Sequence, residues 1–206
     1  PITKSIIDGS LRMRKKLSDF QKDKNKDELL YAIFDLKIAP ITFNFIEFLI
    51  ESEYEANKLG KKGFVIVFVP EGSSRFRNWE EYDSLYDSDY KLWAFHNIVL
   101  PATSLAPKCQ GVNILPRRSD VFRFVKKKDV FPYLYDGLNL RYLDDEIFQK
   151  LNQPGLVEGL RATKQGLRYI ENWCSANKVN NPVVTITIRQ NKFDKVRNSN
   201  IKAYVK

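Results

Sequence analysis

The fold of this chain is decided by residues 64–69, which read FVIVFV. Every side chain in this stretch is apolar, and most of them are β-branched. A strand with no alternating polar residues is buried on both faces, as the central strands of parallel sheets are. Residues 64–69 therefore predict a central parallel strand whose sheet is covered by helices on both sides.

The segment before this strand predicts another strand and a helix. Residues 31–35 read YAIFD, which is typical of a compact buried strand. Over residues 43–59 the apolar side chains recur at steps of three and four, which indicates an amphipathic helix. Thr42 is the predicted N-cap of this helix, and Gly60 is its predicted C-cap.

The segments after the central strand continue the alternation of helices and strands. Residues 121–125 fit either a strand or a loop, and Pro101 is expected to break a helix. The remaining elements that we predict are helices over 90–105 and 157–176 and strands over 111–116 and 182–188. This order predicts an α/β fold, a Rossmann-like three-layer domain with a mostly parallel sheet and helices on both faces.

The pattern divides the chain into three parts. Residues 1–28 form a polar N-terminal segment, and residues 29–190 form the Rossmann-like domain. Residues 191–206 form a C-terminal tail, which we expect to be the start of a second domain.

Composition limits the partners of the chain. The hydrophobic fraction of 43% suits a packed globule, while the net charge of +9 could favour an anionic partner. The positive charges are scattered rather than gathered in one block, which favours a solvated lysine-rich surface, and we do not expect nucleic acid to bind. No apolar run reaches the roughly 18–20 residues that span a bilayer. We expect a cytoplasmic protein with no membrane span.

Ligands of open parallel sheets bind beyond the carboxyl ends of the strands. Asp35 ends the first predicted strand, where it could act as a base, bind a hydroxyl or cap the following turn. Arg189 follows the last predicted strand, where a guanidinium can hold a phosphate through two parallel hydrogen bonds. The stretch Arg197-Asn198-Ser199-Asn200 adds a second cation and three polar side chains. For both arginines the alternative is a solvated surface loop.

Three other segments carry weaker signals. Residues 71–75 resemble a phosphate-binding loop only loosely, because they lack the glycine and lysine spacing of a P-loop. His96, the only histidine, lies in an apolar helical setting that is more typical of a core or boundary residue than of a catalytic one. Residues 117–120 read RRSD, which could hold an anion or form a solvated loop.

The last predicted strand and the loop after it resemble a known family. Residues 183–189 followed by 197–200 are similar to a strand and loop of bacterial glycosyltransferase-like proteins of the two-Rossmann (GT-B) type, which are distantly related to O-fucosyltransferases. Residues 35–45 and 96–101 are similar to further segments of these proteins. In fucosyltransferases a strand ending in His-x-Arg opens the donor-binding half, and Arg189 matches its arginine. Position 187 is Thr instead of the family's His.

The resemblance implies a glycosyltransferase that moves a sugar from a nucleotide-sugar donor to a hydroxyl acceptor. In this scheme Arg189 neutralises the leaving diphosphate, and Asp35 and residues 197–200 contact the substrates. No metal is needed, so we expect no metal and no cofactor. The donor and acceptor sites of the family lie in a cleft between two domains, so a second domain or a partner chain is expected to complete the site. The main alternative is a non-catalytic α/β binding module for an anionic ligand or nucleic acid.

Overall fold

The computed structural model describes residues 28–72, 76–77, 83–84, 86–126, 128–133, 135–137, 157–179, 182–183, 187–190 and 198–200. The chain divides into two compact units, residues 1–163 and residues 164–206. The predicted division into residues 1–28, 29–190 and 191–206 stays a prediction.

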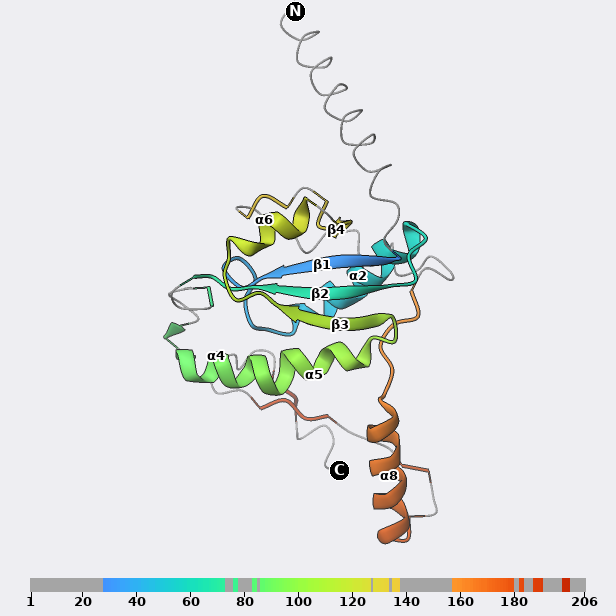
Figure 1. The fold of residues 1–206 in the computed structure, drawn as a ribbon. Helices are drawn as coiled ribbons and strands as arrows, with labels where there is room; N and C mark the ends of the chain where they lie inside the picture. The colour runs from blue at the N-terminus through green and yellow to red at the C-terminus, as the bar shows by residue number, and fades with distance from the viewer. Residues whose placement is uncertain are drawn as a thin grey trace, which may run out of the picture. The chain divides into compact units, whose positions relative to one another are not determined.

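The first unit is built on a four-stranded parallel sheet (Figure 1). Its strands are β1 (Leu29–Asp35), β2 (Gly63–Val69), β3 (Cys109–Ile114) and β4 (Val130–Phe131), in the spatial order β3-β2-β1-β4. Each neighbouring pair is parallel. Strand β2 lies between β1 and β3, which confirms that the FVIVFV stretch is a central strand.

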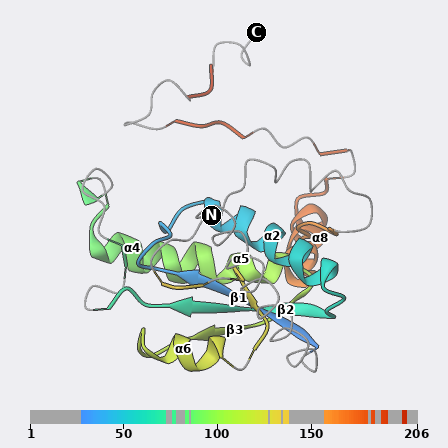
Figure 2. The ribbon, with the colours of Figure 1, turned by 90° about the horizontal axis from the view of Figure 1, so that it is seen from above.

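Helices cover both faces of this sheet (Figure 2). One face packs against α2 (Asn44–Lys58) and against a helical run that consists of α4 (Ser88–Ala94), η1 (Phe95–Val99), α5 (Leu100–Ala102) and η2 (Thr103–Leu105). The other face packs against α6 (Asp120–Val125). The predicted fold class, a Rossmann-like α/β domain with a parallel sheet and helices on both faces, is confirmed.

Aromatic side chains form the centre of the larger core. Phe34 and Phe68 project from neighbouring strands, and their ring centroids lie 5.8 Å apart. Phe45 of α2 lies 5.0 Å from Phe34, and Phe95 of η1 lies 4.9 Å from Phe68, both edge to face. Each such ring removes a large apolar area from water and adds a favourable edge-to-face contact. These rings therefore hold both helical elements on the sheet.

The helical run from Ser88 to Leu105 is not broken at Pro101, contrary to the prediction. Residues 95–99 form a π-helical turn, in which the Leu100 amide donates to the carbonyl of Phe95, five residues earlier. Proline has no amide hydrogen and clashes with the carbonyl four residues before it. The wider π turn occurs just before the proline and lets the helix continue through it.

Three other predicted elements differ in detail. Residues 121–125, whose sequence fits either a strand or a loop, belong to helix α6. The N-cap of α2 is Phe43 and not Thr42, whose hydroxyl instead accepts a 3.4 Å hydrogen bond from the Asn44 amide. The prediction of a final strand over 182–188 is wrong for the described residues 182–183 and 187–188, which are not in a strand.

The helix predicted over 157–176 begins later, because α8 spans Lys164–Ala176. The residues before it make tertiary hydrogen bonds instead. The Glu158 amide donates to the Glu53 carboxylate at 2.8 Å, and the Arg161 amide donates to the carbonyl of Leu105 at 2.7 Å. These bonds hold the backbone in an irregular conformation and delay the start of the helix.

Close packing at Gly63 gives a first prediction. A Cβ atom built at Gly63 would clash with the backbone carbonyl oxygen of Lys108, which also accepts a hydrogen bond from Phe64. We expect Gly63→Ala to lower the free energy of unfolding by about 1–3 kcal/mol, because backbone must move to admit the methyl group. Gly111→Ala on strand β3 is the matched control, since a Cβ there meets no atom within 4 Å. Urea unfolding of both variants measures the difference, and equal stabilities would contradict the prediction.

Candidate functional site

The strand order places a topological switch point between β1 and β4. The chain runs outward from β1 through β2 to β3 and then returns to the opposite side of β1 to form β4. Ligands of open parallel sheets bind beyond the carboxyl ends of the strands at such a point. Asp35 lies there, as the last residue of β1.

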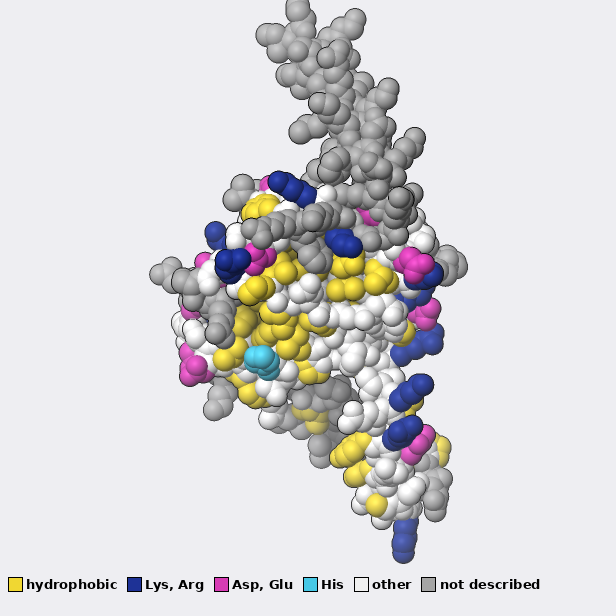
Figure 3. Space-filling view, viewed as in Figure 1, with side chains coloured by type: hydrophobic (Ala, Val, Ile, Leu, Met, Phe, Trp, Pro, Cys, Tyr) yellow, Lys and Arg dark blue, Asp and Glu magenta, His cyan; other side chains and the backbone are white. Residues whose placement is uncertain are grey.

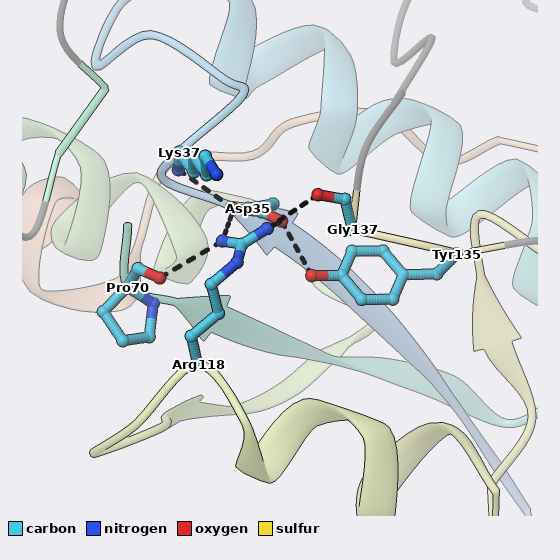
Figure 4. A network of polar contacts seen from close by, with 6 residues as sticks. All are labelled: Asp35, Lys37, Pro70, Arg118, Tyr135 and Gly137. Atoms are coloured by element: carbon cyan, nitrogen blue, oxygen red, sulfur yellow. Dashed lines mark hydrogen bonds and ion pairs between the residues drawn. The ribbon is translucent and has the colours of Figure 1, made fainter. Parts of the chain in front are cut away.

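Asp35 is completely buried, and four donors surround its carboxylate (Figure 4). The guanidinium of Arg118 donates to both carboxylate oxygens at 2.6 Å. The Tyr135 hydroxyl donates to Oδ2 at 2.7 Å, and the Lys37 amide donates to Oδ1 at 2.9 Å. Two parallel bonds from one guanidinium are the strongest way to pair a carboxylate, so this ion pair fixes both side chains.

Arg118 also connects the loops at this edge of the sheet. Its Nη1 donates to the carbonyl of Pro70, directly after β2, at 3.2 Å. Its Nη2 donates to the carbonyl of Gly137, beyond β4, at 2.9 Å. The Asp35–Arg118 network, made of Asp35, Lys37, Pro70, Arg118, Tyr135 and Gly137, therefore joins the segments that follow all four strands (Figure 4).

The electrostatics of the Asp35–Arg118 network favour a fixed arrangement of charges over proton transfer. The hydrogen bond to Asp35 is the main reason that the pKa of Arg118 is raised. Burial, and then the hydrogen bond to Asp35, raise the pKa of Tyr135 well above its ordinary range. The guanidinium stays charged and the phenol stays protonated at neutral pH, and both donate to the same carboxylate. The network holds the carboxyl edge of the sheet in one geometry.

The raised pKa of Tyr135 predicts a loss of stability in alkali. A group whose pKa is raised by folding stabilises the fold fully below its unfolded pKa, about 10 for tyrosine, and this contribution declines as the pH rises toward the folded value. We expect the free energy of unfolding of the wild type to fall more between pH 9 and pH 11 than that of Tyr135→Phe. Urea unfolding at both pH values tests this, since every other titrating group is common to both proteins. Equal declines would contradict it.

A second feature of the first unit is an apolar pocket of about 400 Å³ beside the start of α2. Phe43 lies at its edge and is 78% exposed. The helical run that contains Pro101 provides the opposite wall. The lining residues are Thr42, Phe43, Phe45, Ile46, Asn97, Ile98, Val99, Pro101, Ala102, Ser104, Leu105 and Thr163.

The second unit contains the predicted C-terminal site. The Arg189 amide donates to the Ser199 hydroxyl at 2.9 Å, and the Ser199 amide donates to the carbonyl of Arg189 at the same distance. These reciprocal bonds bring together two predicted site residues that are ten positions apart. Arg189 and Asn200 are exposed, Asn198 is half-buried, and Arg197 lies outside the described residues.

The other sequence candidates have different outcomes. His96 is exposed. Of residues 71–75, which loosely resemble a phosphate-binding loop, the structure describes Glu71 and Gly72. Arg117 pairs with Asp120 at 3.3 Å on the surface. Arg118 does hold an anion, but this anion is the buried Asp35 carboxylate. The predicted ligand-binding role of Asp35 stays a prediction, because the structure gives its carboxylate internal partners.

Sequence reasoning did not identify Tyr135 or the apolar pocket. Tyr135 follows β4, a strand of two residues that carries no periodic pattern. The pocket is bounded in part by the π-helical turn, which is not apparent in the sequence. Among the described residues, no helix is long and apolar enough to cross a membrane. The described residues also contain no group of three or more His, Cys, Asp or Glu side chains that could hold a metal ion.

Comparison with known proteins adds no information on function, so the functional proposal rests on the candidate site. No protein-family model matches the chain, and no curated protein or solved structure is found to match it.

Proposed function

We propose that this chain is part of a glycosyltransferase that moves a sugar from a nucleotide-sugar donor to a hydroxyl acceptor. The observation that carries the proposal is the pair of hydrogen bonds between Arg189 and Ser199. They fix the backbone of Arg189, which is an exposed residue. The Rossmann-like sheet supports the proposal as a frame that is common among nucleotide-binding proteins.

Arg189 has a defined task in such a transfer. The bond between the sugar carbon and the diphosphate oxygen breaks, and negative charge develops on the leaving diphosphate. A guanidinium held beside the phosphate oxygens stabilises this charge. The acceptor hydroxyl forms the new bond to the sugar, and its proton is released to solvent. Asn198 and Asn200 lie beside Ser199 and provide amide groups for hydrogen bonds to the donor.

Asp35 contributes to this proposal through position and not through proton transfer. Its carboxylate already accepts hydrogen bonds from Arg118, Tyr135 and the Lys37 amide. Both carboxylate oxygens are therefore used by partners inside the protein. We therefore assign it to the Asp35–Arg118 network that shapes the edge of the sheet.

A thermal-shift series with nucleoside diphosphates and their sugar conjugates tests the proposed function. A ligand present at 100 times its dissociation constant stabilises the folded state by about 2.7 kcal/mol, which raises the melting temperature by several degrees. We expect such a rise with at least one nucleotide. No rise with any of them at millimolar concentration would contradict the proposal. Salt-sensitive binding to unrelated oligonucleotides, without a nucleotide effect, would favour an anion-binding module instead.

A further inference from the structure

A row of aromatic side chains lies at the start of the helical run that begins with α4. The rings of Tyr86 and Tyr90 stack with centroids 4.5 Å apart, and the rings of Tyr90 and Trp93 lie 5.8 Å apart. Trp93 is 53% exposed and Tyr90 is 38% exposed. We call these three residues the aromatic row. Figure 3 shows hydrophobic side chains gathered next to His96, which follows in the same helical run. Exposed apolar patches of this kind mark binding surfaces.

Polar side chains lie one helical turn to either side of Trp93. Asp89 precedes it by four residues and Asn97 follows it by four, so the three share one stripe of the helical run. Both Asp89 and Asn97 are exposed. The Asn97 amide nitrogen donates to the carbonyl of Trp93 at 2.8 Å, which fixes it above the indole-bearing turn. Asn97 also lines the apolar pocket, so the stripe continues into it.

The described residues 83–84 and 86–98 carry a charge opposite to that of the whole chain. Within the described residues 83–84 and 86–98, the acidic residues are Asp83, Asp87 and Asp89, and the single basic residue is Lys91. Lys91 is buried and pairs with Asp83. The chain as a whole carries a net charge of +9. A surface with exposed carboxylates repels phosphate groups, so nucleic acid and anionic lipid are poor partners for it.

We propose that the aromatic row is a docking surface for a neutral saccharide. One face of a sugar ring is lined by C–H groups and packs on a flat aromatic ring such as that of Trp93. The hydroxyls at the rim of the sugar both donate and accept hydrogen bonds. The Asp89 carboxylate accepts such bonds, and the Asn97 side chain both accepts and donates them. An apolar platform with a few polar groups at its border fits this ligand class.

This proposal goes beyond the proposed function, because saccharide binding at α4 requires neither a nucleotide nor Arg189. The test uses an array of neutral oligosaccharides, with sulfated oligosaccharides as the charged comparison. We expect the wild type to bind at least one neutral saccharide in the absence of any nucleotide. Titration calorimetry with that saccharide then gives its dissociation constant.

Variants locate the binding surface. We expect Trp93→Ala to weaken saccharide binding by about tenfold or more, because truncation of a central aromatic contact removes much of the binding energy. Trp93→Phe should retain most of the affinity, because it keeps a flat ring. Tyr169→Ala is the matched control, since Tyr169 is an exposed aromatic residue on α8. Arg189→Ala should bind the saccharide as the wild type does, which separates this proposal from the proposed function.

Three results would overturn the saccharide proposal. One is the absence of binding to any neutral oligosaccharide on the array. The second is a Trp93→Ala variant that binds as tightly as the wild type while both proteins melt at the same temperature. The third is a preference for sulfated over neutral oligosaccharides, which the charge of this surface opposes.

Discussion

Asp35→Ala is expected to lower the free energy of unfolding by about 3–5 kcal/mol. The substitution leaves the Arg118 guanidinium, whose side chain is 21% exposed, without its carboxylate partner. It also removes the acceptor of the Tyr135 hydroxyl. For a chain of this length the melting temperature should fall by roughly 6–20 °C, at about 2–4 °C for each kcal/mol. Thermal and urea unfolding measure the loss.

Arg117→Ala is the matched control for this experiment. Arg117 is the neighbour of Arg118 in the sequence, but its side chain is 73% exposed and forms a surface ion pair with Asp120. Such pairs contribute little, so we expect a change within about 0.5 kcal/mol. If Asp35→Ala and Arg117→Ala cost the same, the Asp35–Arg118 network does not hold the edge of the sheet together.

A double variant isolates the ion pair within this network. Asp35→Ala combined with Arg118→Met removes both charges and leaves neither one buried alone. We expect its cost to be smaller than the sum of the two single costs by about 0.5–3 kcal/mol. Additive costs would show that the two side chains act independently, which their two 2.6 Å hydrogen bonds contradict.

Arg189→Ala is expected to weaken the binding of a nucleoside diphosphate by roughly 10- to 100-fold. The reason is that the guanidinium makes charge-assisted hydrogen bonds to phosphate in the proposed site. Because Arg189 is exposed, the free energy of unfolding should change by no more than about 0.5 kcal/mol. Titration calorimetry gives the dissociation constant, and urea unfolding gives the stability.

Two further variants sharpen the result at Arg189. Arg168→Ala removes another exposed arginine of the second unit, on α8, and should leave nucleotide binding unchanged. Ser199→Ala removes the hydroxyl that accepts from the Arg189 amide and should weaken binding by a smaller factor than Arg189→Ala. Equal effects at Arg168 and Arg189 would mean that the chain attracts nucleotides through its general positive charge.

The sequence predicted the centre of the sheet because burial leaves a direct pattern there. The uninterrupted apolar run of β2 requires helices on both faces, and the spacing of apolar residues in α2 requires one buried side. Strand β4 has only two residues, Val130 and Phe131, so it offers no period to detect. Strand β4 lies beside β1 because of tertiary packing, and this placement creates the switch point.

The sequence marked Asp35 and Arg118 as candidate site residues but did not predict their contact. Asp35 ends one predicted strand and Arg118 follows another, and the carboxyl ends of parallel strands share one edge of a sheet. The two side chains are 83 residues apart, and residue type alone does not distinguish a guanidinium that pairs inside the protein from one that awaits a ligand. Burial decides between these outcomes, since Asp35 is completely inaccessible to solvent.

The strand predicted over residues 182–188 is a case in which a strong local sequence pattern did not determine the structure of the described residues. Residues 182–188 are rich in β-branched side chains, yet Val183 and Ile188 are 60% and 48% exposed and lie outside any strand. β-propensity reflects how well a side chain fits a pleated, half-buried surface beside neighbouring strands. The reciprocal hydrogen bonds of Arg189 and Ser199 nevertheless join the two segments, 183–189 and 197–200, in which the site was predicted.

The central claim is that the chain recognises the diphosphate of a nucleotide-sugar donor. Titration calorimetry of the wild-type protein with matched pairs, GDP with guanosine and UDP with uridine, tests it most directly. We predict saturable binding of at least one diphosphate and at least tenfold weaker binding of its nucleoside, because each pair differs only in the phosphates. Equal affinities within a pair, or no heat of binding for either diphosphate at millimolar concentration, would contradict the claim.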